Sequence, residues 1–324
     1  MEPKILVSVV IPVKNGEGWL DETIQAILNQ QIEGNFEIVV LDSGSTDGTL
    51  RLLSKYPVTI IHIKPEEFNH GLTRSKGANL ANGKYVVMTV QDAKPVSSFW
   101  LQQLLSGFID NTVAGVCGQQ IVPHHPDMNP AEWYRPVSKP ELRKYHFANT
   151  QDFKNLSFEE QLAICRWDDV NAMYRKDILN RLPFEKTDFA EDVLWAKSAL
   201  QEGYAIVYNP LAQVEHYHHG NYKFAFKRNF ITNYHFYKYF GVFPPENRNL
   251  ILEILRVIKL LVMESGISFI QKWKWFKYNI YLLRAIRKSN GALLEGIRNN
   301  NGAHLDILYR KICQSIPQAF KHGQ

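Results

Sequence analysis

The sequence predicts an α/β fold in which a mostly parallel sheet carries helices on both faces and a helical region follows at the C-terminal end. Two observations lead to this class. Strand-like and helix-like segments alternate over the first hundred residues, and the chain turns basic and aromatic from residue 223 onward. A hydrophobic content of 45% and a charged content of 21% are typical of a globular chain. With 324 residues, the chain is long enough to bury a sizeable core.

The first part of the sheet is predicted from four apolar runs, which suit strands buried on both faces. These strands are residues 5–13, 36–42, 58–63 and 84–90. Apolar residues at helical spacing predict the helices 19–29, 45–53 and 72–81 between them. Ser45, Thr46 and Asp47 offer N-caps for the second helix. Strands and helices that alternate at this spacing indicate a parallel sheet.

The remaining elements are less regular. The predicted order is a helix at 99–108, a strand at 115–122, a long connection with short helices at 123–165, a strand at 169–174, a helix at 189–204 and a strand at 205–216. Helical patterns continue after residue 223, but charged residues interrupt every apolar run before 20 residues, so no transmembrane helix is expected. Three cysteines without a C-x-x-C pair, and an N-terminal apolar run too short for a signal peptide, favour the cytoplasm.

Polar residues follow three of the predicted strands. They are Lys14-Asn15, Asp42-Ser43 and Gln91-Asp92. Ligands of such sheets bind at the carboxyl ends of the strands, so the three clusters predict a nucleotide site. Asp42 can accept a hydrogen bond from a pyrimidine or a ribose. The alternative is that these are solvated loops and turns.

Two groups of residues are candidates for chemistry. Asp92 can hold a divalent cation together with an imidazole of His216 or His218, unless it merely caps the next segment. Glu191 and Asp192 open a predicted helix, where the exposed N–H groups keep a carboxylate ionised and suit a general base. A plain preference of helix starts for acids is the alternative.

Arg74, with Lys76 nearby, can meet a diphosphate or the acidic pair, or it can be part of a solvated helix face. Neither a P-loop nor a G-x-G-x-x-G motif is present.

The C-terminal region differs in charge from the rest of the chain. From residue 223 onward there are 17 Lys and Arg against five Asp and Glu, whereas the preceding part is acidic. Interleaved aromatic and basic residues at 272–284 suit a helix that lies on an anionic membrane. A helical bundle, a homodimer contact or a nucleic-acid-binding region are the alternatives. Nucleic-acid binding would leave Asp92, Glu191 and Asp192 without a role.

Four segments together resemble the GT-A fold, family 2 glycosyltransferases. They are VSVVIPVKNGEGWLDETIQAILNQ, FEIVVLDSGSTDGT, TRSKGANLANGKYVVMTVQDAKP and FAEDVLWAKSALQEGYAIVYNPLAQVEHYHH. The resemblance spans residues 5–222 and is greatest to bacterial rhamnosyltransferases of surface polysaccharide synthesis. It implies a catalytic domain at 1–222, with nucleotide-sugar binding in 1–95 and the acceptor and catalytic part in 96–222, followed by a helical region at 223–324.

The resemblance also implies roles for single residues. The nucleotide sugar would contact Pro12, Val13, Asn15, Asp42, Ser43, Arg74, Gln91 and Asp92. Asp192 would be the catalytic base, Glu191 its neighbour that places the acceptor, and Asp92 with His216 or His218 the ligands of Mn²⁺ or Mg²⁺. Two positions depart from the family pattern, since Val90 replaces the first aspartate of the D-x-D motif and Ser43 replaces a frequent aspartate. Rhamnosyltransferase-like sequences share both departures.

The implied activity is inverting transfer of a sugar, L-rhamnose from dTDP-rhamnose, to a saccharide or a polyprenyl-diphosphate-linked saccharide. A UDP-hexose donor and an inactive nucleotide-sugar-binding scaffold remain open as alternatives. The expected location is the cytoplasm, with peripheral contact to the inner face of the plasma membrane through residues 223–324. A nucleic-acid partner is not expected.

Overall fold

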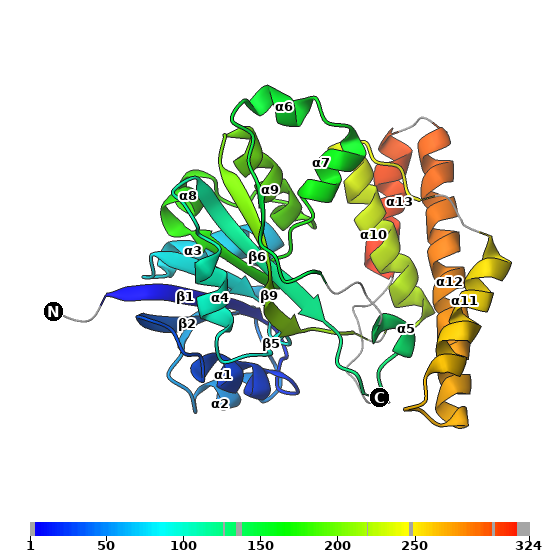
Figure 1. Cartoon of the computed structure of the whole chain (residues 1–324), viewed down its shortest axis with the longest axis horizontal. Helices are drawn as coiled ribbons and strands as arrows, with labels where there is room; N and C mark the ends of the chain where they lie inside the picture. Colours follow the sequence, from blue (N-terminus) through cyan, green and yellow to red (C-terminus); the bar gives the residue numbers. More distant parts are fainter. Residues whose placement is uncertain are drawn as a thin grey trace. The chain divides into compact units, whose positions relative to one another are not determined.

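The structure, a computed structural model, describes residues 4–125, 127–133, 138–218, 220–245, 249–299 and 302–315. The chain forms two compact units (Figure 1). One unit comprises residues 1–121 and 137–216, and the other comprises residues 122–136 and 217–324.

The first unit is built on a mixed sheet whose strand order is β3-β2-β1-β4-β8-β6-β9-β5, with β7 also paired to β9. The strands are β1 (Ile5–Val13), β2 (Asn35–Asp42), β3 (Thr59–His62), β4 (Tyr85–Thr89), β5 (Lys94–Pro95), β6 (Val113–Ile121), β7 (Arg143–Tyr145), β8 (Asn171–Arg175) and β9 (Ala205–Glu215). β1 is parallel to β2 and β4, β2 is parallel to β3, and β6 is parallel to β9. β8 lies antiparallel between β4 and β6.

Helices cover both faces of this sheet. The helices of the described part of this unit are α1 (Leu20–Leu28), α2 (Thr49–Leu53), α3 (His70–Leu80), α4 (Trp100–Ser106), α6 (Thr150–Lys154), α7 (Phe158–Ile164), α8 (Lys176–Arg181) and α9 (Glu191–Gln201), of which α6 packs against α9. α1 and α4 share a buried apolar cluster with Val9 and Ile11 of β1. On the opposite face, α3 packs closely on Val10 and Leu41 at Gly77. A Cβ at this position would lie only 2.5 Å from the side chain of Val10 and 2.7 Å from that of Leu41, so the close approach requires glycine.

The expected α/β class with helices on both faces is confirmed, and the differences are local. β5, β7 and α8 were not predicted, because each has at most six residues and carries little periodicity. α2 starts after Gly48 rather than after a side-chain cap, although Asp47 accepts a hydrogen bond from the backbone N–H of Thr49 at 3.0 Å. Hydrophobic patterning locates a strand but not its direction, so the antiparallel course of β8 was not foreseen.

The second unit is helical. It contains α5 (Pro130–Trp133), α10 (Tyr222–Phe240), α11 (Leu250–Met263), α12 (Phe269–Arg298) and α13 (Gly302–Ser315). Phe230 and Tyr234 of α10 pack with Leu293 of α12 and with Leu305 and Tyr309 of α13. No helix in the described part of the chain is both long and apolar enough to cross a bilayer.

Candidate functional site

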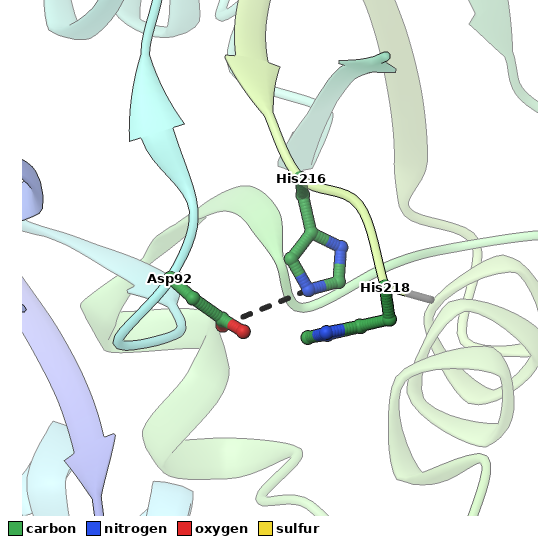
Figure 2. A group of neighbouring side chains, drawn as sticks. All are labelled: Asp92, His216 and His218. Carbon is green, nitrogen blue, oxygen red and sulfur yellow. Dashed lines mark ion pairs between the residues drawn. The ribbon is translucent and has the colours of Figure 1, made fainter. Parts of the chain in front are cut away.

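The carboxylate of Asp92 lies beside two imidazoles at the end of β9. Asp92 follows β4, and His216 directly follows β9, whose Glu215 is paired with Lys94. This pairing brings the segment after β4 to the end of β9, so that Asp92 Oδ1 is 3.7 Å from His216 Nε2 (Figure 2). His218 follows two residues later, and the three residues offer ligand atoms within 4.8 Å of one another.

This donor set suits a divalent transition metal. It combines one carboxylate with two imidazoles, and imidazole nitrogens favour a transition metal over Mg²⁺, which is held by oxygen ligands. Val90, at the first D-x-D position, packs against the apolar core instead of supplying a ligand.

Gln120 of β6 orients the ring of His216. Its Oε1 is 2.7 Å from His216 Nδ1, and its Nε2 donates a hydrogen bond to Oδ2 of Asp168. A carboxylate only accepts, so the amide nitrogen must face Asp168 and the amide oxygen must face the ring. In the neutral ring the proton is therefore on Nδ1, and the lone pair of Nε2 faces Asp92. No sequence pattern marked Gln120.

A buried ion-pair cluster holds the start of α9. Arg74, which is 6% exposed, donates to Glu191 Oε1 at 2.8 Å, and its Nε lies 3.2 Å from Asp169 Oδ2. The hydroxyl of Tyr174 donates to the other oxygen of Asp169. The sequence left two partners open for Arg74, a diphosphate or the pair Glu191-Asp192, and in the structure its guanidinium contacts Glu191. Gly71 makes this approach feasible, because a Cβ there would be 1.9 Å from the carbonyl oxygen of Glu185.

Asp192 is held by two backbone groups. Its Oδ1 accepts from the N–H of Val193 at 2.7 Å and its Oδ2 from the N–H of Asp169 at 3.2 Å. Burial, followed by the charges of Glu191, Asp169 and Asp168, raises the pKa of Asp192 well above its ordinary value. Burial likewise raises the pKa of Asp169 to about 7, although Arg74 acts in the opposite direction.

Contacts link Asp92 to Asp168, a carboxyl whose charge acts on Asp192. They run from Asp92 to His216, then to Gln120 and Asp168. All five residues lie in the first unit. Asp168 was also missed from the sequence, where the only signal is an acidic pair, Asp168-Asp169, before a predicted strand.

The residues expected to contact the nucleoside lie together at the ends of β1 and β2, where Pro12 and Val13 are paired with Leu41 and Asp42. The N–H of Ser43 donates to the carbonyl of Val13 at 3.0 Å. Asp42 is buried and accepts from the N–H of Gly44 at 3.2 Å, so it also has the turn role that was the alternative.

Hydrogen bonds from two further side chains connect the segments that follow β1, β2 and β4. Asn15 has a left-handed backbone (φ 51°), and its Oδ1 accepts from the N–H of Thr46 at 2.8 Å. Gln91 Oε1 accepts from the N–H of Lys14 at 2.9 Å, which connects the segment after β4 to the end of β1. The three polar clusters therefore lie at one edge of the sheet, as expected from parallel strands.

A pocket of about 150 Å³ lies over β6, β7 and β9. Its lining includes the basic side chains of Arg143 and Arg166 and the aromatic side chains of Tyr145, Trp167 and Tyr208. The guanidinium of Arg143 is 5.7 Å from the centre of the Tyr208 ring. Within the described residues, neither arginine is paired with a carboxylate. Trp167, directly before Asp168, donates from its indole nitrogen to Tyr174 at 2.7 Å, so the pocket shares a wall with the buried cluster.

Comparison with known proteins gives consistent matches. The profile described as "Glycosyl transferase family 2" matches residues 8–182. The chain is 33% identical over 235 residues to the O-antigen chain rhamnosyltransferase WbaN of Salmonella anatum, which covers 69% of this chain and 70% of that protein. It is 30% identical over 232 residues to the O-antigen chain rhamnosyltransferase RfbN of Salmonella typhimurium, covering 70% and 71%.

Solved structures share the fold at low identity. A mannosyltransferase from Pyrobaculum calidifontis, solved with GDP-Man and Mn²⁺, matches with a TM-score of 0.51 and 17% identity over 97% of this chain and 81% of that one. S. aureus TarS 1-349 in complex with UDP matches with a TM-score of 0.50 and 15% identity over 92% of both chains.

Proposed function

Because the chain belongs to glycosyltransferase family 2, we propose that this glycosyltransferase transfers L-rhamnose from dTDP-rhamnose, with inversion, to a saccharide of a bacterial surface polysaccharide. The choice of sugar is supported by two relatives that are named rhamnosyltransferases and match about 70% of the chain. One observation carries the catalytic part: a continuous set of contacts links Asp92 and His216 to Asp168, whose charge acts on Asp192.

Glycosyl transfer needs stabilisation of the departing diphosphate and removal of a proton from the attacking hydroxyl. Asp92 with His216 or His218 would hold Mn²⁺ or Mg²⁺, which neutralises negative charge on a diphosphate. Pro12, Val13, Asn15, Asp42, Ser43 and Gln91 would contact the nucleotide part of the donor.

Asp192 is the proposed general base. Its raised pKa means that, once ionised, it binds the proton of an acceptor hydroxyl more strongly than an ordinary aspartate does. The two backbone N–H groups fix the orientation of the carboxylate. Arg74 neutralises Glu191 and Asp169 and thereby reduces the repulsion that ionised Asp192 would meet.

The pocket with Arg143 and Arg166 is the proposed site for an anionic group of the acceptor. The small volume of about 150 Å³, with two arginines and two tyrosines in its lining, suits a compact anionic group such as one phosphate or carboxylate. Two guanidinium groups without a carboxylate partner among the described residues can bind such a group. A lipid-linked acceptor carries phosphate next to its first sugar, which agrees with this chemistry.

The donor assignment is tested with a thermal-shift panel of dTDP-rhamnose, UDP-hexoses and the free diphosphates, with and without Mn²⁺. The true donor stabilises the folded state by RT ln(1 + [L]/Kd), so dTDP-rhamnose should give the largest shift. A larger shift with a UDP-hexose would replace the donor. Absence of any nucleotide-sugar hydrolysis, together with normal binding, would indicate an inactive scaffold.

A further inference from the structure

α11 of the second unit has an apolar outer face. Val257 and Leu261 point inward and pack with Ile267 and Trp275. On other sides of the same helix, large apolar side chains are exposed over 40–71% of their surface. They are Ile251, Leu252, Leu255, Ile258, Val262 and Met263. Four of these, at 251, 255, 258 and 262, recur at helical spacing and form a stripe along one side.

The first turns of α12, which packs against α11 (Figure 1), also carry exposed apolar side chains. Phe269 is 83% exposed, Ile270 is 80% exposed and Trp273 is 53% exposed. We call these three residues and the six of α11 the apolar patch. Soluble monomers rarely expose so many neighbouring apolar side chains, and contiguous apolar surfaces of this kind mark an interaction site.

Basic residues are interspersed with the apolar patch along α11 and α12. Residues 250–284 contain six Lys and Arg but only Glu253 and Glu264 as acids. Glu253 is already paired with Arg287 at 3.7 Å. Lys277 lies 5.1 Å from the ring centre of Trp273, so cationic and aromatic groups alternate at the edge of the patch.

We propose that the apolar patch docks peripherally on a bilayer that contains anionic lipids. Apolar side chains would enter the region below the headgroups, Trp273 and Tyr281 would lie at headgroup depth, and Lys272, Lys274 and Lys277 would contact lipid phosphates. A second copy of the chain fits less well, because a symmetric contact would bring two cationic surfaces together. The purpose of the docking, access to a lipid-linked acceptor, rests on the proposed function, whereas the surface itself does not.

The test is flotation of the full chain with vesicles of neutral phosphatidylcholine, with and without one quarter phosphatidylglycerol. We expect binding to the anionic vesicles that weakens at least tenfold between 0.1 and 0.5 M salt, since the Debye length falls from about 10 Å toward 3 Å near 1 M. The triple variant Ile251→Ser/Leu255→Ser/Val262→Ser should lose flotation. Lys272→Gln/Lys274→Gln/Lys277→Gln should bind anionic vesicles on the order of 100-fold more weakly.

Matched controls come from the first unit. Ile109→Ser/Phe158→Ser removes side chains of similar exposure, and Lys55→Gln/Lys154→Gln/Lys186→Gln removes exposed charges; both should float as the parent chain does. Unchanged flotation of the apolar triple variant would overturn the inference. A parent dimer that this variant converts to a monomer, without any vesicle binding by the parent, would assign the patch to self-association instead. Hydrolysis of dTDP-rhamnose without vesicles reports the proposed function separately, and the triple variant should retain it.

Discussion

The side-chain oxygen of Gln120 lies 2.7 Å from Nδ1 of His216. Because the amide nitrogen of the same residue donates to Asp168, the glutamine cannot turn over without losing both hydrogen bonds. Gln120 therefore selects the tautomer of the neutral His216 ring, which is proposed to bind metal. It also contacts Asp168, whose charge adds to the effect of burial in raising the pKa of Asp192. The following predictions begin from this arrangement.

Gln120→Leu should weaken Mn²⁺ binding by about 10–100-fold, because the imidazole loses the partner that orients it. The measurement is a Mn²⁺ titration followed by electron paramagnetic resonance, supported by ¹⁵N NMR of the His216 tautomer in the metal-free protein. Gln213→Leu, on β9, is the matched control and should bind Mn²⁺ normally. Equal Mn²⁺ affinity in all three proteins would show that Gln120 does not position the ligand.

Asp192→Asn should lower turnover by about 10²–10⁴-fold or more and leave the affinity for the donor diphosphate unchanged, because only proton removal is lost. In the parent enzyme the rate should rise with pH as Asp192 loses its proton, since its pKa is raised. Initial rates across pH, with isothermal titration of dTDP, measure both effects. The exposed Asp188→Asn is the control. Near-normal turnover of Asp192→Asn would rule out this residue as the base.

Arg74→Met should destabilise the fold by about 3–5 kcal/mol, because Glu191 and Asp169 would be buried without their cation. Urea unfolding measures the loss. Adding Glu191→Gln to the variant should restore part of the stability, whereas Arg51→Met, at an exposed ion pair, should change it by less than about 1 kcal/mol. If Arg74→Met and Arg51→Met cost the same, the buried cluster has no special energetic role.

The buried carboxyl of Asp169 should make stability depend on pH. Its pKa is raised from 3.8 to about 7, so the folded chain holds this proton more tightly than the unfolded chain does. The resulting stabilisation is fully present below about pH 4 and is lost as the pH rises through about 7. The free-energy advantage of the parent over Asp169→Asn should therefore shrink between pH 5 and 8, by at most about 1.4 kcal/mol per pH unit. Urea unfolding at several pH values tests this, and a constant difference would contradict it; the exposed Asp152→Asn should show no such trend.

Arg143→Gln/Arg166→Gln should raise the KM for a phosphate-bearing acceptor at least tenfold, with the KM for the donor unchanged, because only the acceptor pocket loses charge. Inorganic phosphate should inhibit the parent competitively against such an acceptor, and glucuronate should do so if the anionic group is a carboxylate. The exposed Arg181→Gln serves as control. An unaltered acceptor KM in the double variant would remove this pocket from acceptor binding.

Much of the scaffold was predictable because buried strands and amphipathic helices have clear periodicities. The predicted strand at 5–13 is β1, and the predicted helix at 189–204 contains α9. The approach of Asp92 to His216 was also predictable, since both follow strands at one edge of the sheet.

The remaining features depend on contacts between distant segments. Gln120 is 96 residues from His216 and 48 residues from Asp168, and no local pattern encodes either contact. Arg143 and Arg166 belong to the irregular connection, where only tertiary packing brings them to one pocket. The exposure of α11 was hidden for a related reason: a helix with apolar residues on several sides resembles a core helix until its neighbours are known.

The start of α3 has no room for a side chain at Gly71. The space for a single methyl group there is taken by the carbonyl of Glu185, and the next contact is the β-carbon of Glu191. Any side chain at this position would push the helix away from that strip of backbone and carry the guanidinium of Arg74 with it. The absence of a side chain at Gly71 therefore keeps Arg74 beside Glu191 and so maintains the charges around the proposed base.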